Sequence, residues 1–163
     1  MLVGVLKGAL IFLADLVRAV DLGVEVTIDF LAISRYAPDS GRVRILKDLD
    51  VEIEGRDVVI VEDLVDTGLT LAYLLGYVRA LGPRRVRTCA LLDRPARRIV
   101  PQPVEYVGAQ IADVFVLGYG LHWQDRYRNV DAVYVVDRDA VADDPGRYVS
   151  ALYNARSGRE DGW

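Results

Sequence analysis

The sequence predicts an α/β fold in which a mainly parallel central sheet is flanked by helices. Short apolar runs of strand length alternate along the chain with segments whose apolar residues recur at helical spacing. Residues 58–61 (VVIV) form a continuous β-branched run, which is typical of a strand buried on both faces of a parallel sheet. A helical segment and a further apolar run follow it, and this order is that of a βαβ crossover.

Composition and charge limit the class of protein. The chain has 163 residues, of which 52% are hydrophobic, and this is enough for one domain with a buried core. The net charge of −4 argues against a mainly nucleic-acid-binding surface, although the basic pairs at 84–85 and 97–98 leave local anion sites open. The single cysteine, Cys89, excludes an internal disulfide, and its apolar neighbours predict a buried thiol rather than a nucleophile.

The N-terminal part predicts a strand, a turn and a helix. Residues 2–6 are apolar, Lys7 and Gly8 make the turn, and residues 9–20 carry apolar positions at helical spacing. These polar interruptions argue against a signal peptide, and no stretch reaches the ~20 apolar residues that cross a bilayer. We therefore expect a cytoplasmic protein that has neither a membrane nor a nucleic acid as its partner.

The rest of the chain continues the alternation. Residues 24–33 are rich in β-branched side chains and predict a second strand, and residues 36–41 have the punctuation of an exposed loop. Residues 42–53 predict a strand and its return. After the strand at 58–61, a helix is predicted over 69–81, stopped by a Gly-Pro pair, and the next strand follows it. Beyond residue 137 the chain is polar and its periodicity is weak.

The loop between the strand at 58–61 and the following helix carries the strongest functional signal. Residues 67–70 present backbone N–H groups at a helix start, where unpaired donors and the positive dipole end favour a phosphate. Glu62 and Asp63 can accept hydrogen bonds from vicinal hydroxyls or hold a hydrated Mg²⁺, and Asp66 is placed to act as a base. A sugar phosphate would span both halves. The alternative is an ordinary turn whose Asp and Thr residues cap the helix.

Several motifs resemble the type I phosphoribosyltransferases. The stretch VVIVEDLVDTGLTL resembles the motif that binds phosphoribosyl diphosphate (PRPP), and its Glu-Asp-x-x-Asp-Thr-Gly form resembles the hypoxanthine-guanine branch. Further segments resemble that branch in the same order: LVGVLKGALIFLADLVRAV, ILKDLDVEIEGRDV, LLDRPARR, EYVGAQIADVFVLGYGL and RYRN. The resemblance covers residues 1–138 and leaves 139–163 as a polar C-terminal tail.

The resemblance implies a fold, an activity and ligands. The fold would be that of a single type I phosphoribosyltransferase domain over 1–163, with a reduced hood, because family members usually begin some tens of residues earlier. The activity would be a step of purine salvage: Mg²⁺-dependent transfer of 5-phosphoribosyl from PRPP to hypoxanthine or guanine, giving IMP or GMP and pyrophosphate. The alternative is a non-catalytic PRPP- or nucleotide-binding regulator derived from this fold. A homodimer or homotetramer is expected from the family alone.

The resemblance also assigns roles to residues. Asp66 would handle the proton on N7 of the purine, and Glu62 and Asp63 would bind the ribose hydroxyls and Mg²⁺, the metal largely through PRPP and water. The remaining assignments are PRPP binding by Thr67, Gly68, Leu69 and Thr70; pyrophosphate binding by Lys7, Gly8 and Arg128; purine binding by Arg94, Phe115, Val116 and His122; and a mobile loop containing Ser34 and Tyr36. The loop that would correspond to Leu6-Lys7-Gly8 often holds a non-proline cis peptide in the family. Plain alternatives stay open for three of these residues: a surface lysine for Lys7, a core residue for Phe115 and a solvated charge for Arg128.

The sequence departs from the family pattern at two site positions. Arg94 stands where the family normally has a lysine that donates to the purine 6-oxygen, and the larger planar guanidinium predicts an altered base preference. His122 stands where the family has an aspartate that helps to bind the second Mg²⁺. Two interpretations of His122 remain, a substitute base-contacting group or a drifted position in a weakened enzyme, and Asp125 could supply the lost carboxylate.

Overall fold

The computed structural model describes residues 1–20, 23, 25–34 and 43–154, and these fall into two compact units. The first unit is Met1–Asp113 and contains the large sheet. The second is Val114–Trp163 and contains a small sheet and two short helices. That the whole chain forms a single domain with a reduced hood stays a prediction. In the part of the chain that is described, no helix is long and apolar enough to span a membrane.

A six-stranded sheet with the order β3-β2-β1-β4-β5-β6 forms the centre of the first unit. Its strands are β1 (Leu2–Leu6), β2 (Ile28–Ile33), β3 (Ile45–Lys47), β4 (Asp57–Val65), β5 (Arg85–Asp93) and β6 (Tyr106–Gln110). All neighbours pair in parallel except β3, which runs antiparallel to β2. The predicted α/β fold with a mainly parallel sheet is confirmed. The helical elements are α1 (Leu10–Ala19), α2 (Leu69–Ala80) and the short 3-10 turn η1 (Pro95–Arg97).

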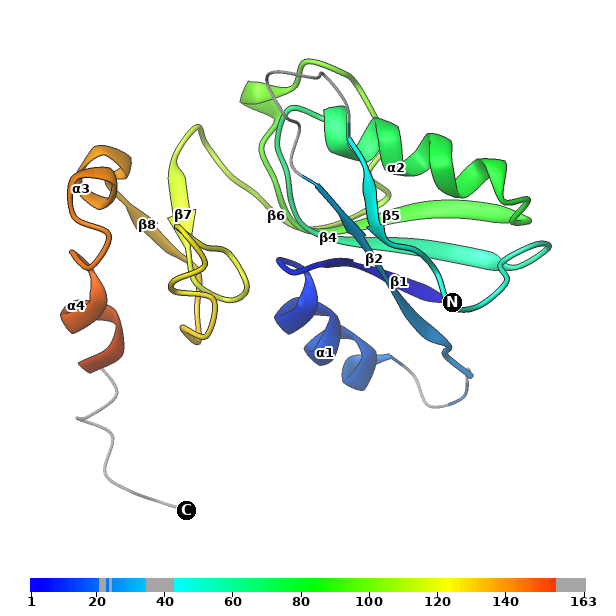
Figure 1. The fold of residues 1–163 in the computed structure, drawn as a ribbon, viewed down its shortest axis with the longest axis horizontal. Helices are drawn as coiled ribbons and strands as arrows, with labels where there is room; N and C mark the ends of the chain where they lie inside the picture. The colour runs from blue at the N-terminus through cyan, green and yellow to red at the C-terminus, as the bar shows by residue number, and fades with distance from the viewer. Residues whose placement is uncertain (21–22, 24, 35–42, 155–163) are drawn as a thin grey trace. The chain divides into compact units, whose positions relative to one another are not determined.

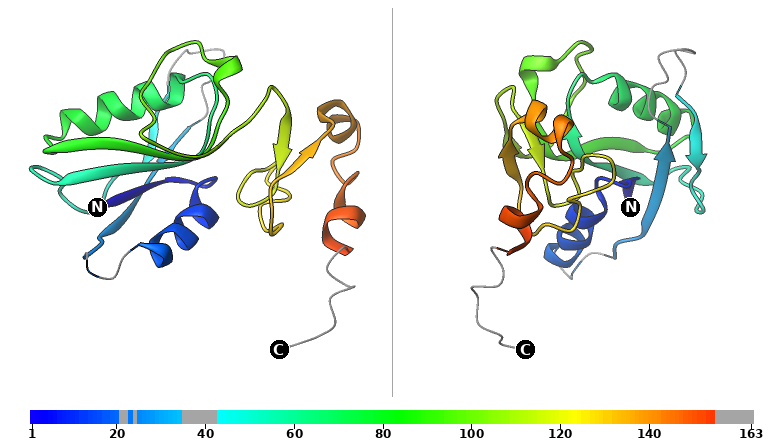
Figure 2. Two further views of the ribbon diagram at one scale, coloured as in Figure 1. Left: turned by 180° about the vertical axis from the view of Figure 1, so that it is seen from behind. Right: turned by 60° about the vertical axis from the view of Figure 1, so that its left-hand side comes forward.

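Helices α1 and α2 cover opposite faces of this sheet (Figures 1 and 2). Alternate residues of β4 point to the two faces, as the pleat of a strand requires. Ile60 packs in one apolar cluster with Leu74 of α2, and Val61 packs in the other with Leu13 of α1. This double burial explains the continuous β-branched run of β4. Cys89 lies in the α1 cluster as a free, buried thiol, as predicted, and burial raises its pKa.

The segment predicted as a strand and its return, residues 42–53, forms less strand than expected. Only β3, three residues long, pairs with β2, and the described return contains no strand. The return is held instead by the buried Asp29 of β2, whose carboxylate accepts hydrogen bonds from the N–H groups of Asp50 (2.8 Å) and Val51 (3.1 Å). A side chain thus does here what a strand ladder would otherwise do.

The second unit is built from short elements. They are the antiparallel strands β7 (Phe115–Leu117) and β8 (Tyr134–Val136) and the helices α3 (Arg138–Asp143) and α4 (Val149–Asn154). Their core includes Leu117, Tyr127, Val130 and Val141. The segment expected to be a polar tail therefore contributes a fully buried valine and two helices, each too short to show helical periodicity in the sequence.

Candidate active site

The carboxyl ends of β1, β4 and β5 meet at one edge of the sheet, and a pocket of about 180 Å³ opens at the end of β4. It is lined by Glu62, Asp63, Leu64, Val65, Asp66, Thr67, Gly68, Thr70 and Leu71. These residues run from the end of the strand through the loop into the first turn of α2. The edge is where ligands of parallel α/β sheets bind.

Gly68 makes the turn from strand to helix possible. It occupies the N-cap position of α2 with a φ of +82°, a backbone conformation that favours glycine. A Cβ at this position would also collide with the carbonyl oxygen of Val100. Glycine at position 68 therefore allows both the turn into α2 and the close approach of Val100.

The turn after β1 lies against the same edge. The peptide bond between Leu6 and Lys7 is cis, as the resemblance led us to expect. A Cβ on Gly8 would overlap the carboxylate of Asp63 as it now lies, so a larger residue here would require the Asp63 side chain to move. Asp63 Oδ1 also accepts a hydrogen bond from the N–H of Leu64 (2.8 Å). The structure thus brings the predicted pyrophosphate turn together with one of the predicted metal-binding acids.

Glu62 is buried, with only 5% of its surface exposed. Burial, together with the negative charge of the adjacent Asp63, raises the pKa of Glu62 well above its usual value. A carboxyl group in this situation favours its protonated form in the ligand-free protein. A nearby cation or hydroxyl donors would favour the charged form instead.

Asp66 and Arg94 form an incompletely satisfied pair. Arg94 Nη1 lies 3.4 Å from Asp66 Oδ2, and Arg94 is 4% exposed. Two further atoms of the pair, Asp66 Oδ1 and Arg94 Nε, are buried and have no hydrogen-bond partner in the described part of the chain. Since buried polar atoms are normally paired, this spot suits a ligand that offers both a donor and an acceptor.

The base-contacting residues predicted in the second unit lie on and beside β7. Phe115 packs edge-on against Trp123, with ring centroids 5.6 Å apart and planes at 86°. Val116 is buried and faces Val135 of β8 in the strand register. Phe115 also borders the apolar core of this unit, so its packing agrees with the plain core role left open above.

Arg128 and His122 belong to one hydrogen-bonded loop. The Arg128 guanidinium donates to the carbonyl of Gly120 (2.7 Å) and, through two nitrogens, to Asp125 Oδ1 (3.2 and 2.9 Å). His122 Nδ1 accepts a hydrogen bond from the N–H of Asp125 (3.0 Å), which places the proton of a neutral imidazole on Nε2. The Asp125 carboxylate is therefore already paired with Arg128.

Of the two predicted mobile-loop residues, only Ser34 is described. Its N–H donates to the carbonyl of Arg44 (2.8 Å), and its hydroxyl accepts from the N–H of Arg44 (3.0 Å). Ser34 thus closes the end of the β2–β3 ladder. Tyr36 lies outside the described residues, so its predicted role stays a prediction.

Comparisons with known proteins identify the family of this chain. Residues 1–125 match the phosphoribosyl transferase domain family. The hypoxanthine-guanine phosphoribosyltransferase of Bacillus subtilis is 43% identical over 137 residues, which are 82% of this chain and 75% of that protein. That of Mycobacterium avium is 47% identical over 140 residues, 84% of this chain and 68% of that protein. The chain belongs to the hypoxanthine-guanine phosphoribosyltransferase family.

Solved structures of this family have the same fold. The crystal structure of a hypoxanthine-guanine phosphoribosyltransferase from Bacillus anthracis superposes with a TM-score of 0.79 at 42% identity and covers 83% of this chain and 81% of that chain. A Trypanosoma cruzi hypoxanthine phosphoribosyl transferase superposes with a TM-score of 0.81, also at 42% identity, and covers 87% of this chain and 75% of that chain. The predicted type I phosphoribosyltransferase fold is confirmed.

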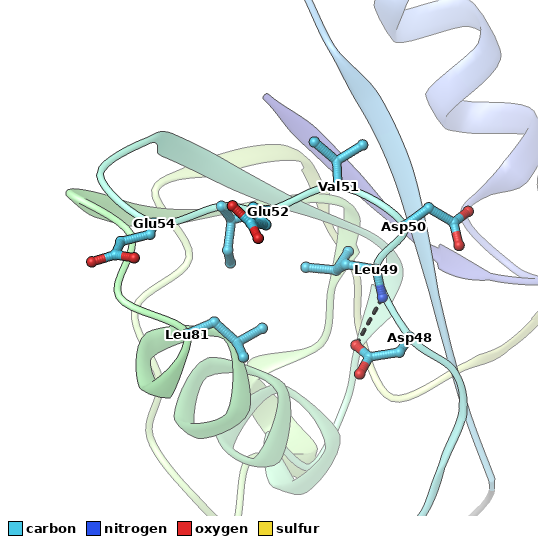
Figure 3. Close-up of a pocket in the computed structure, with 8 residues that line it drawn as sticks. Asp48, Leu49, Asp50, Val51, Glu52, Glu54 and Leu81 are labelled. Atoms are coloured by element: carbon cyan, nitrogen blue, oxygen red, sulfur yellow. Dashed lines mark hydrogen bonds between the residues drawn. The ribbon is translucent and has the colours of Figure 1, made fainter.

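A larger pocket of about 360 Å³ lies away from the sheet edge formed by the carboxyl ends of β1, β4 and β5 (Figure 3). It is lined by residues 48–54 and by Leu81, which follows the carboxyl end of α2. Helix α2 connects two parallel strands and runs back across the sheet, so this pocket lies towards the amino ends of the strands. Figure 3 shows Leu49 and Leu81 facing the hollow, with carboxylates of the 48–54 segment around it. Four acidic side chains among seven residues disfavour a phosphate here.

Sequence reasoning noted the basic pair at 97–98 but did not separate its two members. Arg97 forms a surface ion pair with Asp113 (2.5 Å), whereas Arg98 donates to the backbone of the Asp66 loop (3.0 Å). Spacing alone gives no signal for this difference, because Arg97 is the last residue of the short 3-10 turn and Arg98 follows it directly.

Proposed function

We propose that this chain catalyses the Mg²⁺-dependent transfer of the 5-phosphoribosyl group from PRPP to hypoxanthine or guanine, a reaction of purine salvage that yields IMP or GMP and pyrophosphate. The observation that carries the proposal is the pocket at the end of β4. Three carboxylates, those of Glu62, Asp63 and Asp66, and the N-terminus of α2 line one cavity. A ribose that bears a 5′-phosphate needs both kinds of surface.

The 5′-phosphate would bind at residues 67–70. The N–H groups of a helix start have no partners within the helix, and the helix dipole adds partial positive charge. Gly68 lets the backbone approach the anion closely, and Thr67 and Thr70 add hydroxyl donors. The N–H of Leu69 donates to Thr67 Oγ1 (3.4 Å) in the ligand-free protein, and a phosphate oxygen would replace that acceptor.

Glu62 and Asp63 would bind the ribose hydroxyls and a Mg²⁺ ion. Carboxylate oxygens are the ligands that Mg²⁺ prefers, so these residues fit the ion. No group of three or more His, Cys, Asp or Glu side chains suited to a metal exists among the residues described, so PRPP and water would provide its other oxygen ligands. The bound ion would supply charge neutralisation for the departing pyrophosphate.

Asp66 would act as the proton acceptor for the purine, next to Arg94. The unpartnered Asp66 Oδ1 would accept the proton on N7 of the base, and Arg94 would donate to its 6-oxygen. A 6-oxopurine offers that donor and that acceptor on one edge. Arg94 also holds Asp66 through the 3.4 Å contact, so the group that reads the base would orient the group that receives its proton.

The remaining roles rest on the family resemblance. Phe115 would stack on the base and the Val116 backbone would read its edge, while His122 would take the position beside the purine. Lys7, Gly8 and Arg128 would bind the pyrophosphate. These cationic and N–H donors would stabilise charge on the leaving group as the anomeric C–O bond breaks. Assembly into a homodimer or homotetramer likewise stays a prediction.

The proposal is tested by nucleotide formation. The purified chain is incubated with PRPP, Mg²⁺ and, separately, hypoxanthine, guanine, xanthine and adenine, and products are resolved chromatographically. We expect IMP and GMP, with little or no product from adenine, because adenine lacks the 6-oxygen that Arg94 would contact. An Arg94→Lys variant assayed in parallel shows how the guanidinium sets the preference among the oxopurines.

The same assay separates the enzyme from a binding protein. If folded protein forms no nucleotide with any of the four bases, the catalytic proposal fails. Stabilisation of that protein by PRPP would then favour a non-catalytic PRPP-binding regulator.

A further inference from the structure

The segment that follows β5 is hydrogen-bonded to the loop at residues 65–68. The N–H of Arg94 donates to the carbonyl of Val65 (2.9 Å), and the N–H groups of Ile99 and Val100 both donate to the carbonyl of Thr67 (2.9 and 3.0 Å). Backbone donors therefore hold the carbonyls on either side of Asp66. The carbonyl of Asp66 itself is left for a side chain.

The Arg98 guanidinium binds that middle carbonyl. Its Nε donates to the carbonyl of Asp66 (3.0 Å), and its Nη2 lies 3.4 Å from the carbonyl of Val65. The same Nη2 pairs with the carboxylate of Asp93 at the end of β5, and both charged side chains are largely buried. Because a guanidinium is planar and carries its donors in a fixed fork, the two loop carbonyls and the end of β5 are held by one rigid group.

These contacts determine where the loop N–H groups point. Within a planar trans peptide unit the carbonyl and the N–H are directed to opposite sides. By holding the carbonyl of Asp66, Arg98 directs the N–H of Thr67 away from the 94–100 segment, and the bonds to the Thr67 carbonyl direct the N–H of Gly68 in the same way. Residues 94–100 are all described, and none of them lines the 180 Å³ pocket. The segment therefore supports the loop from outside the pocket.

We propose that Arg98 is a positioning residue, which sets the N–H groups of Thr67 and Gly68 for the 5′-phosphate of PRPP. The identity of the ligand rests on the proposed function, whereas the contacts of Arg98 do not. Arg98 acts through the loop and touches no reacting atom. The donors of an anion site bind more tightly when their orientation is fixed before the anion arrives, because less order is lost on binding.

The adjacent arginine provides a matched control. Arg97 also forms an ion pair, but both side chains are about half exposed, and its guanidinium donates to Asp113 (2.5 Å) rather than to the 65–68 loop. Arg97→Met thus removes one arginine and one ion pair from the same turn. It leaves the described contacts to the loop in place.

The test compares Arg98→Met, Arg98→Lys, Arg97→Met and the double variant Asp93→Asn/Arg98→Met. The double variant is essential because Arg98→Met alone leaves the buried Asp93 carboxylate without its partner, which can unfold the protein. Binding of ribose 5-phosphate is measured by thermal stabilisation, so that no turnover is needed. KM for PRPP, KM for the purine and kcat are measured separately.

We expect the folded double variant to bind ribose 5-phosphate about tenfold more weakly or worse, because two charge-assisted contacts that orient the loop are gone. KM for PRPP should rise in proportion, while kcat and KM for the purine change by less than about threefold. Arg98→Lys should lose an intermediate amount, since a single ammonium keeps the pair with Asp93 but not the fork. Arg97→Met should behave as wild type.

Unchanged ribose 5-phosphate affinity in the folded double variant would overturn the inference, as would a wild-type protein that does not bind ribose 5-phosphate. Full recovery of affinity in Arg98→Lys would also contradict it, because the charge pair with Asp93 would then be sufficient. A wild-type chain that binds ribose 5-phosphate but forms no nucleotide would contradict the proposed function. The role of Arg98 would then be decided by the ribose 5-phosphate affinities of the variants alone.

Discussion

The pKa values of two buried carboxylates in the same sheet, Asp29 of β2 and Glu62 of β4, are shifted in opposite directions. The two residues are 4% and 5% exposed, respectively. Burial alone would raise the pKa of Asp29, but hydrogen bonds from the N–H groups of Phe30, Asp50 and Val51, together with the charge of Lys47, outweigh it and lower that pKa. Burial and the charge of Asp63 raise the pKa of Glu62 well above its usual value.

The difference separates a structural part of the sheet from its ligand-binding edge. At Asp29 the protein supplies the partners, and the carboxylate fastens the 48–51 return. At the carboxyl end of β4 it leaves charges close together and buried polar atoms unpaired, including Asp66 Oδ1. An arrangement that costs stability in the free protein is the one a ligand can complete.

The largest effect is expected for Asp66→Asn at the binding edge. The amide keeps the size and a hydrogen-bonding oxygen but cannot accept the purine proton. We predict a loss of kcat of about 10²- to 10⁴-fold, the usual contribution of a general base, with little change in PRPP affinity. Steady-state kinetics and PRPP-induced thermal stabilisation measure the two quantities. Parallel losses in both would show that Asp66 holds the ligand rather than the proton.

Asp29→Ala should lower the stability of the fold without affecting the ligand-binding edge. It removes the acceptor for three backbone N–H groups and one of the two acidic partners of Lys47, so we predict a loss of about 3 kcal/mol in the free energy of unfolding. Chemical denaturation measures this loss. Turnover per folded molecule should stay near wild type, and a selective loss of kcat would show that Asp29 serves the site.

The stability that Asp29 provides should depend on pH in a defined direction. Its folded-state pKa lies below the usual 3.8, so the folded protein binds fewer protons than the unfolded chain between the two values. The contribution is complete above pH 3.8 and is lost as the pH falls through the folded-state pKa. The difference in stability between wild type and Asp29→Asn should shrink over that acidic window.

The charge of Glu62 should affect stability with the opposite sign to that of Asp29, and Glu62→Gln tests this. Because the pKa of Glu62 is raised above 4.5, the unfolded chain loses this proton at lower pH than the folded protein does. The free energy of unfolding of the wild type therefore falls as the pH rises above 4.5. Glutamine avoids this penalty, and we predict a gain of about 1 kcal/mol near pH 8.

The same substitution should weaken PRPP binding. An amide accepts a ribose hydroxyl less strongly than a carboxylate and is a poorer Mg²⁺ ligand. Higher stability with lower PRPP affinity is the expected pattern for a residue kept for its ligand. Thermal unfolding with and without PRPP and Mg²⁺ measures both, and a destabilised variant would place Glu62 with Asp29 as a structural acid.

Much of the first unit could be predicted from sequence, because its signals are local or periodic. The β-branched run of β4 and the spacing of α2 gave both elements to within a few residues, and Gly68 with its neighbours indicated an anion loop. The contact of Gly8 with Asp63 could not be inferred, since it joins the turn after β1 to a residue of β4 that lies 55 positions further along the chain. Family resemblance, rather than spacing, pointed to Lys7 and Gly8.

The parts that sequence did not predict depend on side chains acting over long distances. Residues 48–53 alternate acidic and apolar side chains as a strand would, but they form no strand because hydrogen bonds to Asp29 replace a ladder. Helix α3 is too short for its buried Val141 to form a pattern. Arg97 and Arg98 are chemically identical neighbours with different partners. Only the fold decides which arginine reaches the Asp66 loop.

The smallest effect is expected at His122, where the same comparison between paired and unpaired carboxylates applies to the second unit. There the Asp125 carboxylate resembles Asp29 rather than Glu62, because Arg128 already pairs with it at 2.9 Å. It is therefore poorly placed to replace the aspartate that the family usually has at position 122. In the present protein, His122 Nδ1 accepts a hydrogen bond from the N–H of Asp125 (3.0 Å). The carboxylate introduced by His122→Asp should be able to accept the same hydrogen bond.

We predict that His122→Asp raises activity by a few fold at low Mg²⁺ and has little effect at saturating Mg²⁺, since a carboxylate is a better ligand for this ion than an imidazole. His122→Asn is the matched control, because it offers an acceptor without the charge. Initial rates across a Mg²⁺ titration decide the matter. Identical Mg²⁺ dependence in all three proteins would mean that position 122 contributes nothing to metal binding.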